Sequence, residues 1–391
     1  MAGPLHGIRV LDLSRLLPGP YCTMMMADLG AEVVKIEDPS QGDYIRWIPP
    51  YADGIGSKYL ALNRNKKSAS LNLKDPRARD IFLELIEKYD IVVESFRPGV
   101  MEKLGVGYDT ASAVNPKIIY CSLTGYGQTG PYADRAGHDI NYIGYTGVLS
   151  LTGPCDGKPV PPGIQVGDIA GALNALIGIL TALHERGRSG HGQHVDVSLA
   201  DSAFAALPMT FADHQCGEPQ TRGGTHLTGG IPCYNTYETS DGEYVCIGAI
   251  EPKFFKVFCR LVGREDLEVL HLGTGKDRDR LESELTAMFK TRTRAEWIEL
   301  LEPADVCFGP VNNIEQALED PQMKAREMIV DVPTGKGGSI KLTGLPFKLS
   351  RYETAPPTAP PGPGEHTAAV LAEVGVTEEQ LAKLVKSGAA K

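Results

Sequence analysis

The feature that most constrains the fold is a strand–helix–strand pattern at the start of the chain. Residues 8–13 form an apolar run typical of a buried strand, and Leu-Pro-Gly-Pro at 17–20 interrupts it. Residues 21–29 then favour a helix, with a proline suited to its first turn, and residues 32–36 favour a second strand. Strands joined through a helix run parallel, so this opening predicts an α/β fold with a helix-covered parallel sheet.

The same alternation continues along the first half of the chain. It predicts a helix at 78–88, strands at 91–94 and 117–122, a long helix at 169–186 and a strand at 194–198. We expect Gly187 to end the long helix in a left-handed conformation.

The second half of the chain has a different pattern. Residues 234–250 predict a hairpin turning at Asp241-Gly242, and helical segments follow to about residue 317. The proline-rich stretch 354–364 cannot form regular structure and should lead to a final short helix.

Composition excludes several classes of protein. A formal charge of −10 over 391 residues argues against a nucleic-acid partner. The eight cysteines include no CxxC pair, so we expect neither a metal site nor a disulfide scaffold. No signal-peptide pattern and no apolar run of membrane-spanning length is found, so we expect a cytoplasmic protein without a membrane partner.

The turn after the first strand argues against two cofactor classes. Its sequence, SRLLPGPY, lacks the three spaced glycines that let a backbone approach a pyrophosphate, and no Gly-Lys-Ser/Thr loop is found. The basic cluster Arg64, Lys66 and Lys67 is typical of solvated surface, although it could serve an anionic cofactor. A Rossmann-like fold without dinucleotide binding is therefore expected.

Three side chains are candidates for chemistry. Asp168 begins the long helix, where a carboxylate can cap helix amides or be offered to a substrate as base or nucleophile. His138 can be a structural hydrogen-bond partner or a general acid/base. Glu251 can be a solvated loop carboxylate or the partner that orients a histidine. Taken residue by residue, the structural role is favoured for all three.

The order of several longer segments points to a family. The chain contains the following segments: VLDLSRLLPGPYCTMMMADLGAEVVKIE, ESFRPGVMEKLG, GHDINYIGYTGVLSLTG, VGDIAGALNALIGILTALHERGRSGHGQHVDVSLAD, CYNTYETSDGEYVCIGAIEP and PVNNIEQALEDPQMKAREM. Together they resemble the class III CoA-transferase (CaiB/BaiF) family, which includes the α-methylacyl-CoA racemases. The similarity covers nearly the whole chain.

The resemblance implies a Rossmann-like large domain, with a parallel sheet built from both chain ends, and a smaller α+β domain. We expect the large domain to comprise 1–205 and a returning segment 331–391, with a linker at 206–228 and the small domain at 229–330. The resemblance also implies an interlocked homodimer that takes an acyl-CoA as substrate. Coenzyme A would enter as part of the thioester, with no tightly bound cofactor.

The resemblance assigns roles to individual residues. Asp168 would be the shared catalytic carboxylate, with His138 and Glu251 completing the catalytic set. The residues expected to contact coenzyme A are Phe96, Arg97, Lys103, Asp139 and Tyr142.

Two reactions divide the family, and several positions bear on the choice. His138 in GHDINY and Glu251 in GAIEP match the racemase branch, and Leu17 stands where transferases carry a glutamine. Against this, Ile164 stands where racemases usually have asparagine. Asp38 stands where a basic residue near the coenzyme A nucleotide often follows the second strand, which bears on the expected coenzyme A contacts and not on the reaction.

The sequence therefore favours epimerisation at Cα of a 2-methylacyl-CoA by proton transfer between His138 and Asp168. An enolate would form, stabilised by a donor such as a backbone amide near Asp168. The alternative is a CoA-transferase that moves CoA to a free carboxylic acid through an anhydride and a thioester on Asp168.

Overall fold

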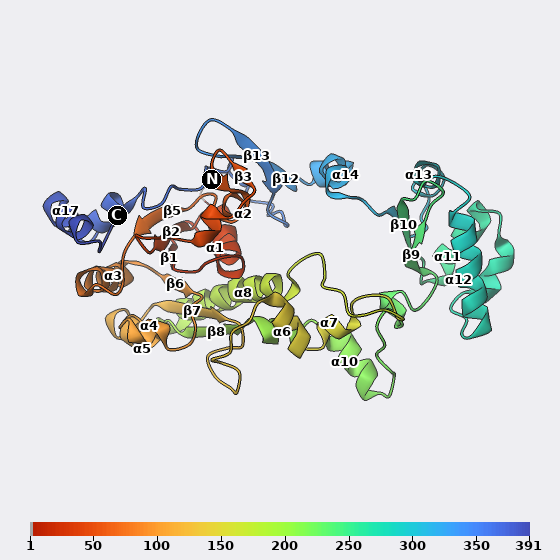
Figure 1. Cartoon of the computed structure of the whole chain (residues 1–391), viewed down its shortest axis with the longest axis horizontal. Coiled ribbons are helices and arrows are strands. Elements are labelled where there is room, and N and C mark those ends of the chain that lie inside the picture. The colour runs from red at the N-terminus through yellow and green to blue at the C-terminus, as the bar shows by residue number, and fades with distance from the viewer. Residues whose placement is uncertain (1–2) are drawn as a thin grey trace. The chain divides into compact units, whose positions relative to one another are not determined.

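The computed structural model describes residues 3–391, and the chain divides into two units (Figure 1). The first unit comprises residues up to 146 together with 164–206 and 321–391. The second unit comprises 147–163 and 207–320. Both ends of the chain therefore belong to the first unit.

The first unit is built on a six-stranded parallel sheet. Its strands are β1 (Arg9–Asp12), β2 (Glu32–Glu37), β5 (Lys67–Ser70), β6 (Ile91–Glu94), β7 (Ile119–Thr124) and β8 (His194–Ser198). Their order is β5-β2-β1-β6-β7-β8, and every pair is parallel. Counted along the chain this is 3-2-1-4-5-6, the order of dinucleotide-binding folds. The predicted parallel sheet is confirmed, but all six strands precede residue 199, so the C-terminal segment adds helices to the unit and no strand to this sheet.

Helices cover both faces of this sheet. Successive strand residues point to opposite sides, so the apolar strands have an apolar face on each side that must be buried. Val10 and Val33 belong to one core cluster, whereas their neighbours Leu11 and Val34 belong to the other. The first cluster includes side chains of α1 (Pro18–Asp28) and α8 (Val166–Ser189). The second includes side chains of α3 (Pro76–Lys88), α5 (Tyr108–Val114), α16 (Thr367–Ala372) and α17 (Glu378–Lys386).

Shorter elements complete the first unit. They are η1 (Tyr44–Trp47), β3 (Tyr51–Ala52), β4 (Ile55–Gly56), α2 (Ser57–Leu62), α4 (Val100–Lys103), α6 (Asp139–Tyr145), α9 (Leu199–Phe204), α15 (Pro321–Ala325), β12 (Ile329–Pro333) and β13 (Ser339–Thr343).

The long helix α8 ends later than predicted. Gly187 lies inside the helix, and the left-handed residue is Gly190, with φ 79°. The amide of Gly190 donates to the carbonyl of Arg186 (2.8 Å), which satisfies one of the free carbonyls at the helix end. By length and hydropathy α8 alone among the described helices could span a membrane, but 39% of its apolar window is buried inside the protein.

The second unit combines a small antiparallel sheet with helices. The sheet has the order β11 (Phe308–Pro310), β10 (Tyr244–Gly248), β9 (Tyr234–Glu238), and Gly242 turns the predicted hairpin with φ 77°. The helices are α7 (Val148–Leu151), α10 (Pro208–Gln215), η2 (His226–Thr228), α11 (Pro252–Leu261), η3 (Glu265–Leu270), α12 (Lys276–Phe289), α13 (Arg294–Leu301) and α14 (Ile314–Glu319).

The unit boundaries differ from those expected from the sequence. Residues 206–228, expected as a linker, contain α10 and fall almost wholly in the second unit, which ends at residue 320 and not at 330. Residues 147–163 also belong to the second unit, where Arg222 Nε donates to the carbonyl of Ser150 (3.0 Å). Such a contact between distant segments leaves no periodic signal in the sequence.

Candidate active site

A pocket opens at the carboxyl ends of the central strands of the first unit. It encloses about 590 Å³ and is lined by the segments that follow β1, β6 and β7, together with the starts of α6 and α8. Between β1 and β6 the strand order reverses, so the connections leave in opposite directions and open a crevice, which is where open parallel sheets bind ligands.

Asp168 lines this pocket as the third residue of α8, and not as the N-cap that the sequence suggested. The capping function belongs to Asp139, the first residue of α6. Its Oδ1 accepts hydrogen bonds from the amides of Gly167 (2.7 Å) and Asp168 (3.1 Å). Within residues 3–391 no group donates a hydrogen bond to the carboxylate of Asp168, which is therefore available to a substrate.

The protonation of Asp168 is set by its surroundings. Burial raises the pKa of its carboxyl group to about 7, and the negative charge of Asp139 adds to the increase. A carboxylate balanced near neutral pH is suited both to proton transfer and to nucleophilic attack. The same geometry corrects one expectation, because the amides of Gly167 and Asp168 already donate to Asp139 and are not free to stabilise an enolate oxygen.

His138 and Tyr142 come to the same pocket from α6. His138 is the N-cap of this helix and has an exposed side chain that lines the pocket with Asp168. Tyr142 is buried, and its hydroxyl donates to the carbonyl of Gly137 (2.5 Å). Burial and the nearby Asp168 raise the pKa of Tyr142 to about 12, so its phenol stays protonated at neutral pH.

The predicted coenzyme A contacts are only partly brought together. Phe96 and Arg97 line the pocket, on the loop after β6, where Glu94 Oε2 accepts the amide of Phe96 (2.8 Å). Lys103 is exposed at the end of α4 and is not among the lining residues. Asp139 is also absent from the lining, because its carboxylate holds the start of α8.

Glu251 belongs to the second unit, where it is the N-cap of α11 with an exposed side chain. It is not one of the residues that line this pocket. Its pairing with His138 stays a prediction.

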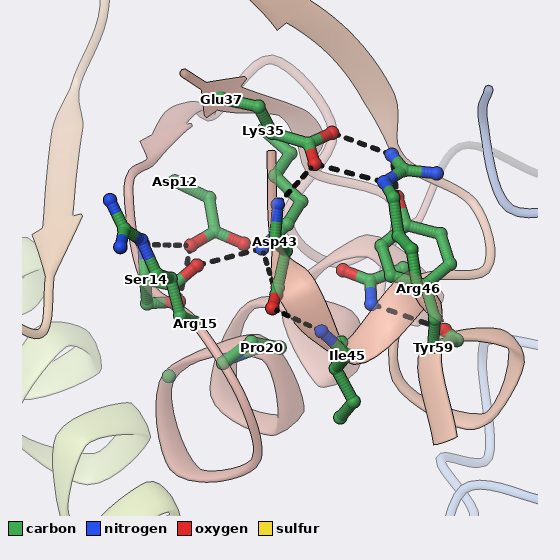
Figure 2. A network of polar contacts seen from close by, with 12 residues as sticks. Asp12, Ser14, Arg15, Pro20, Lys35, Glu37, Asp43, Ile45, Arg46 and Tyr59 are labelled. Atoms are coloured by element: carbon green, nitrogen blue, oxygen red, sulfur yellow. Dashed lines mark hydrogen bonds and ion pairs between the residues drawn. The ribbon is translucent and has the colours of Figure 1, made fainter. Parts of the chain in front are cut away.

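Arg15 and Tyr44 are among the residues of the pocket wall that sequence reasoning missed. Each directly follows a residue of a buried network of polar contacts, which Figure 2 shows around Lys35. Lys35 Nζ donates to the carbonyl of Ser14 (2.7 Å) and pairs with Asp43 Oδ2 (3.1 Å), the residues directly before Arg15 and Tyr44. The only sequence signal for Arg15 was its position after the carboxyl end of the first strand.

Two cations of the basic cluster, Arg64 and Lys66, lie in the interior and not, as expected, at the surface, whereas Lys67 is 42% exposed and pairs with Glu32 (3.2 Å). Arg64 pairs with Asp28 (2.6 Å) and Lys66 with Asp12 (3.0 Å), and all four side chains are at most 3% exposed. These cations are neutralised inside the unit, so they do not form a cofactor site. Charged residues are buried in this way only when they are paired.

The pocket itself carries an excess of positive charge. Its lining includes three arginines, Arg15, Arg97 and Arg135, and a single acidic residue, Asp168. This contrasts with the chain as a whole, whose formal charge is −10. A cationic pocket in an acidic protein selects anionic ligands.

Comparisons with known proteins show the family of the chain. The model of CoA-transferase family III matches residues 5–367. The chain belongs to this family. The whole structure is similar to that of a CAIB/BAIF family protein from Brucella suis, with a TM-score of 0.84 and 33% identity over 96% of this chain and 100% of that one.

Relatives in the family carry out both reactions considered for this chain. A succinyl-CoA:glutarate CoA-transferase from mouse is 36% identical, over 98% of this chain and 90% of the relative. An α-methylacyl-CoA racemase from mouse is 35% identical, over 97% of this chain and 96% of the relative. The family III member described here is thus an enzyme of the CoA-transferase and racemase group, and similarity alone does not separate the two reactions.

Proposed function

We propose that this family III enzyme is a CoA-transferase that moves CoA from an acyl-CoA to a free carboxylic acid through Asp168. The observation that carries the proposal is the pocket lining, in which three arginines accompany a single carboxylate. Transfer requires the pocket to bind a free carboxylate as well as the anionic acyl-CoA, whereas epimerisation of a 2-methylacyl-CoA requires no second anion. The sequence favoured epimerisation over CoA transfer, and the pocket lining reverses this preference.

The proposed reaction uses the free carboxylate of Asp168 as nucleophile. An Asp168 oxygen attacks the thioester carbonyl, the C–S bond breaks, and a mixed anhydride and CoA thiolate form. The thiolate attacks the Asp168 side of the anhydride, which releases the first acid and leaves an Asp168–CoA thioester. The acceptor carboxylate attacks this thioester and again expels thiolate, which then attacks the acceptor carbonyl, forms the new acyl-CoA and regenerates Asp168.

Oxygen labelling tests this route directly. An acceptor acid labelled with ¹⁸O in its carboxylate leaves one ¹⁸O on Asp168 after each turnover, because the anhydride is cleaved on the acceptor side. Mass spectrometry of the peptide that contains Asp168 should show a gain of 2 Da per label, together with formation of the new acyl-CoA. Asp168→Ala should lose both signals. Asp201→Asn is a matched control, since Asp201 is also the third residue of a helix but is exposed. New acyl-CoA without label on Asp168 would contradict the mechanism.

Epimerisation is the second candidate because His138 and Asp168 line the same pocket and the pKa of Asp168 is raised to about 7. One epimer of a 2-methylacyl-CoA would be incubated in heavy water without any acceptor acid. Deuterium at Cα with epimerisation, lost in His138→Ala and Asp168→Ala, would establish the racemase. Failure of every acid to accept CoA, together with this exchange, would refute the transferase.

We also propose that the enzyme is a homodimer, as the family resemblance implies. The exposed face of α8 supports this, since Leu173, Ile177 and Leu180 form an apolar stripe that is 36–60% exposed. Size-exclusion chromatography with light scattering should give twice the mass of 42.1 kDa. Ile177→Lys should shift the protein toward monomer, and a monomeric wild type would refute the proposal.

A further inference from the structure

Arg15 differs from the other two arginines of the pocket. It is half-buried and forms no ion pair within 4 Å among residues 3–391, although its charge interacts at longer range with the carboxylate of Asp38. Its guanidinium carbon lies 4.9 Å from the centre of the Phe96 ring. By contrast, Arg135 is exposed, donates to the hydroxyl of Tyr145 (2.8 Å) and stacks on Tyr132 (4.0 Å), while Arg97 is exposed on its loop.

The backbone around Arg15 is fixed by hydrogen bonds on both sides. The amide of Arg15 donates to Ser95 Oγ (3.1 Å), on the loop after β6. The amide of Ser14 donates to Asp12 Oδ1 (2.9 Å), and its carbonyl accepts from Lys35 Nζ (2.7 Å). Arg15 is therefore held in place before any ligand binds.

The next residue shows that this turn is held under strain. Leu16 has φ 64°, a left-handed conformation that is costly for a residue with a Cβ atom, and it also lines the pocket. Such a conformation persists only where the surrounding structure enforces it, and it is found preferentially at functional sites. The strain and the hydrogen bonds together indicate a preorganised backbone at Arg15, from which the guanidinium group lies against the Phe96 ring.

The buried ion pairs beneath the turn do not neutralise Arg15. Lys66 pairs with Asp12 (3.0 Å), Lys35 with Asp43 (3.1 Å) and Arg46 with Glu37 (2.5 Å). Figure 2 shows Arg15 beside this cluster, in which each cation has an acidic partner. Arg15 interacts with Asp38 only at longer range than an ion pair, so its guanidinium group is left to bind a ligand at the pocket wall.

We propose that Arg15 binds the second carboxylate of a dicarboxylic acid, or of its acyl-CoA, whose first carboxyl group reacts at Asp168. The inference deepens the proposed function and rests on it, because a free dicarboxylic acid enters the pocket only if the enzyme transfers CoA. A guanidinium group forms two parallel, charge-assisted hydrogen bonds with a carboxylate, and such bonds are stronger than neutral ones. A monocarboxylic chain of equal length would leave the half-buried guanidinium group without a partner, so the site should discriminate against it.

Transfer to paired acceptors tests the proposal. Acceptors of equal carbon number, succinate against butyrate and glutarate against valerate, would be compared by kcat/KM with one acyl-CoA donor. The wild type should prefer the dicarboxylic acids, and Arg15→Met should reduce this preference by about ten- to a hundredfold. Arg15→Lys should restore part of it. Arg79→Met, which removes a half-buried arginine paired with Asp80 on α3, should leave the preference unchanged.

Binding separates this inference from the proposed function. In an Asp168→Ala background, which cannot turn over, the dissociation constants of succinyl-CoA and butyryl-CoA would be compared with and without Arg15→Met. If the wild type fails to transfer CoA but Arg15→Met still removes a preference for succinyl-CoA, the proposed function fails and the role of Arg15 stands. If Arg15→Met weakens both thioesters and all acids equally, or changes nothing, the role of Arg15 is refuted.

Discussion

Replacing Asp168 by asparagine should stabilise the first unit while abolishing activity. Burial of the carboxylate raises its pKa from 3.8 to about 7. At about 1.4 kcal/mol for each tenfold change, this difference corresponds to roughly 4 kcal/mol of destabilisation once the group is ionised. The start of α8 favours a negative charge by about 0.3–1 kcal/mol, and asparagine loses this benefit. We therefore expect Asp168→Asn to raise the free energy of unfolding by about 3 kcal/mol at pH 8.

The gain should depend on pH in a defined direction. The folded protein holds the Asp168 proton more tightly than the unfolded chain, because its folded pKa is the higher one. As the pH rises from about 4 to 7 the unfolded chain loses this proton first, so the wild type loses stability across that window. Asparagine has no proton to lose. The advantage of Asp168→Asn should therefore be absent at pH 4, grow toward pH 7 and be complete at pH 8.

Urea unfolding at several pH values measures this difference. Hydrogen exchange of peptides from α8, followed by mass spectrometry, assigns the change to the first unit. Asp201→Asn is the control, since Asp201 occupies the same position in α9 but is exposed, and it should change stability by less than about 1 kcal/mol. A variant no more stable than the wild type at pH 8, or equally stabilised at pH 4 and pH 8, would refute the reasoning.

Three further substitutions test the site and its support. Asp139→Asn keeps an acceptor oxygen for the two α8 amides but removes the negative charge that helps to raise the pKa of Asp168. The acidic limb of the pH profile of kcat/KM should therefore move below pH 7. An acidic limb at the same pH in the variant and the wild type would contradict this. Lys35→Met leaves Asp43 buried without its partner and should cost about 3–5 kcal/mol in urea unfolding, against less than about 0.5 kcal/mol for the exposed Lys341→Met. Burial raises the pKa of Glu94 to about 7, so Glu94→Gln should stabilise the protein in thermal melts at pH 8 and have no such effect at pH 4.

Several features of the fold could be read from local sequence. The strands at Arg9–Asp12 and Glu32–Glu37, the helix between them and the hairpin at Gly242 lie where the apolar runs and turn residues placed them. These elements depend on interactions between near neighbours, which periodicity and turn chemistry report. The end of α8 was misplaced at Gly187 because two glycines three residues apart both permit a left-handed residue, and packing selects between them.

The sequence identified several residues of the pocket but not how they are arranged. Five residues named from motifs are brought to one pocket by the structure: Phe96, Arg97, His138, Tyr142 and Asp168. Their roles depended on contacts between segments far apart in the chain. The sequence could not show that Asp139 caps α8 and thereby leaves the carboxylate of Asp168 free.

The sequence by itself determined the parallel α/β fold and the family, because both are encoded in local patterns and in the order of motifs. Only the tertiary structure decided which charges are neutralised. Lys66 and Arg64 are as basic in the sequence as Arg15, yet the first two are buried against Asp12 and Asp28 while Arg15 lines the pocket. The free energy of a charged side chain depends on its burial and on the partner that the fold brings to it, and neither is a property of neighbouring residues in the chain.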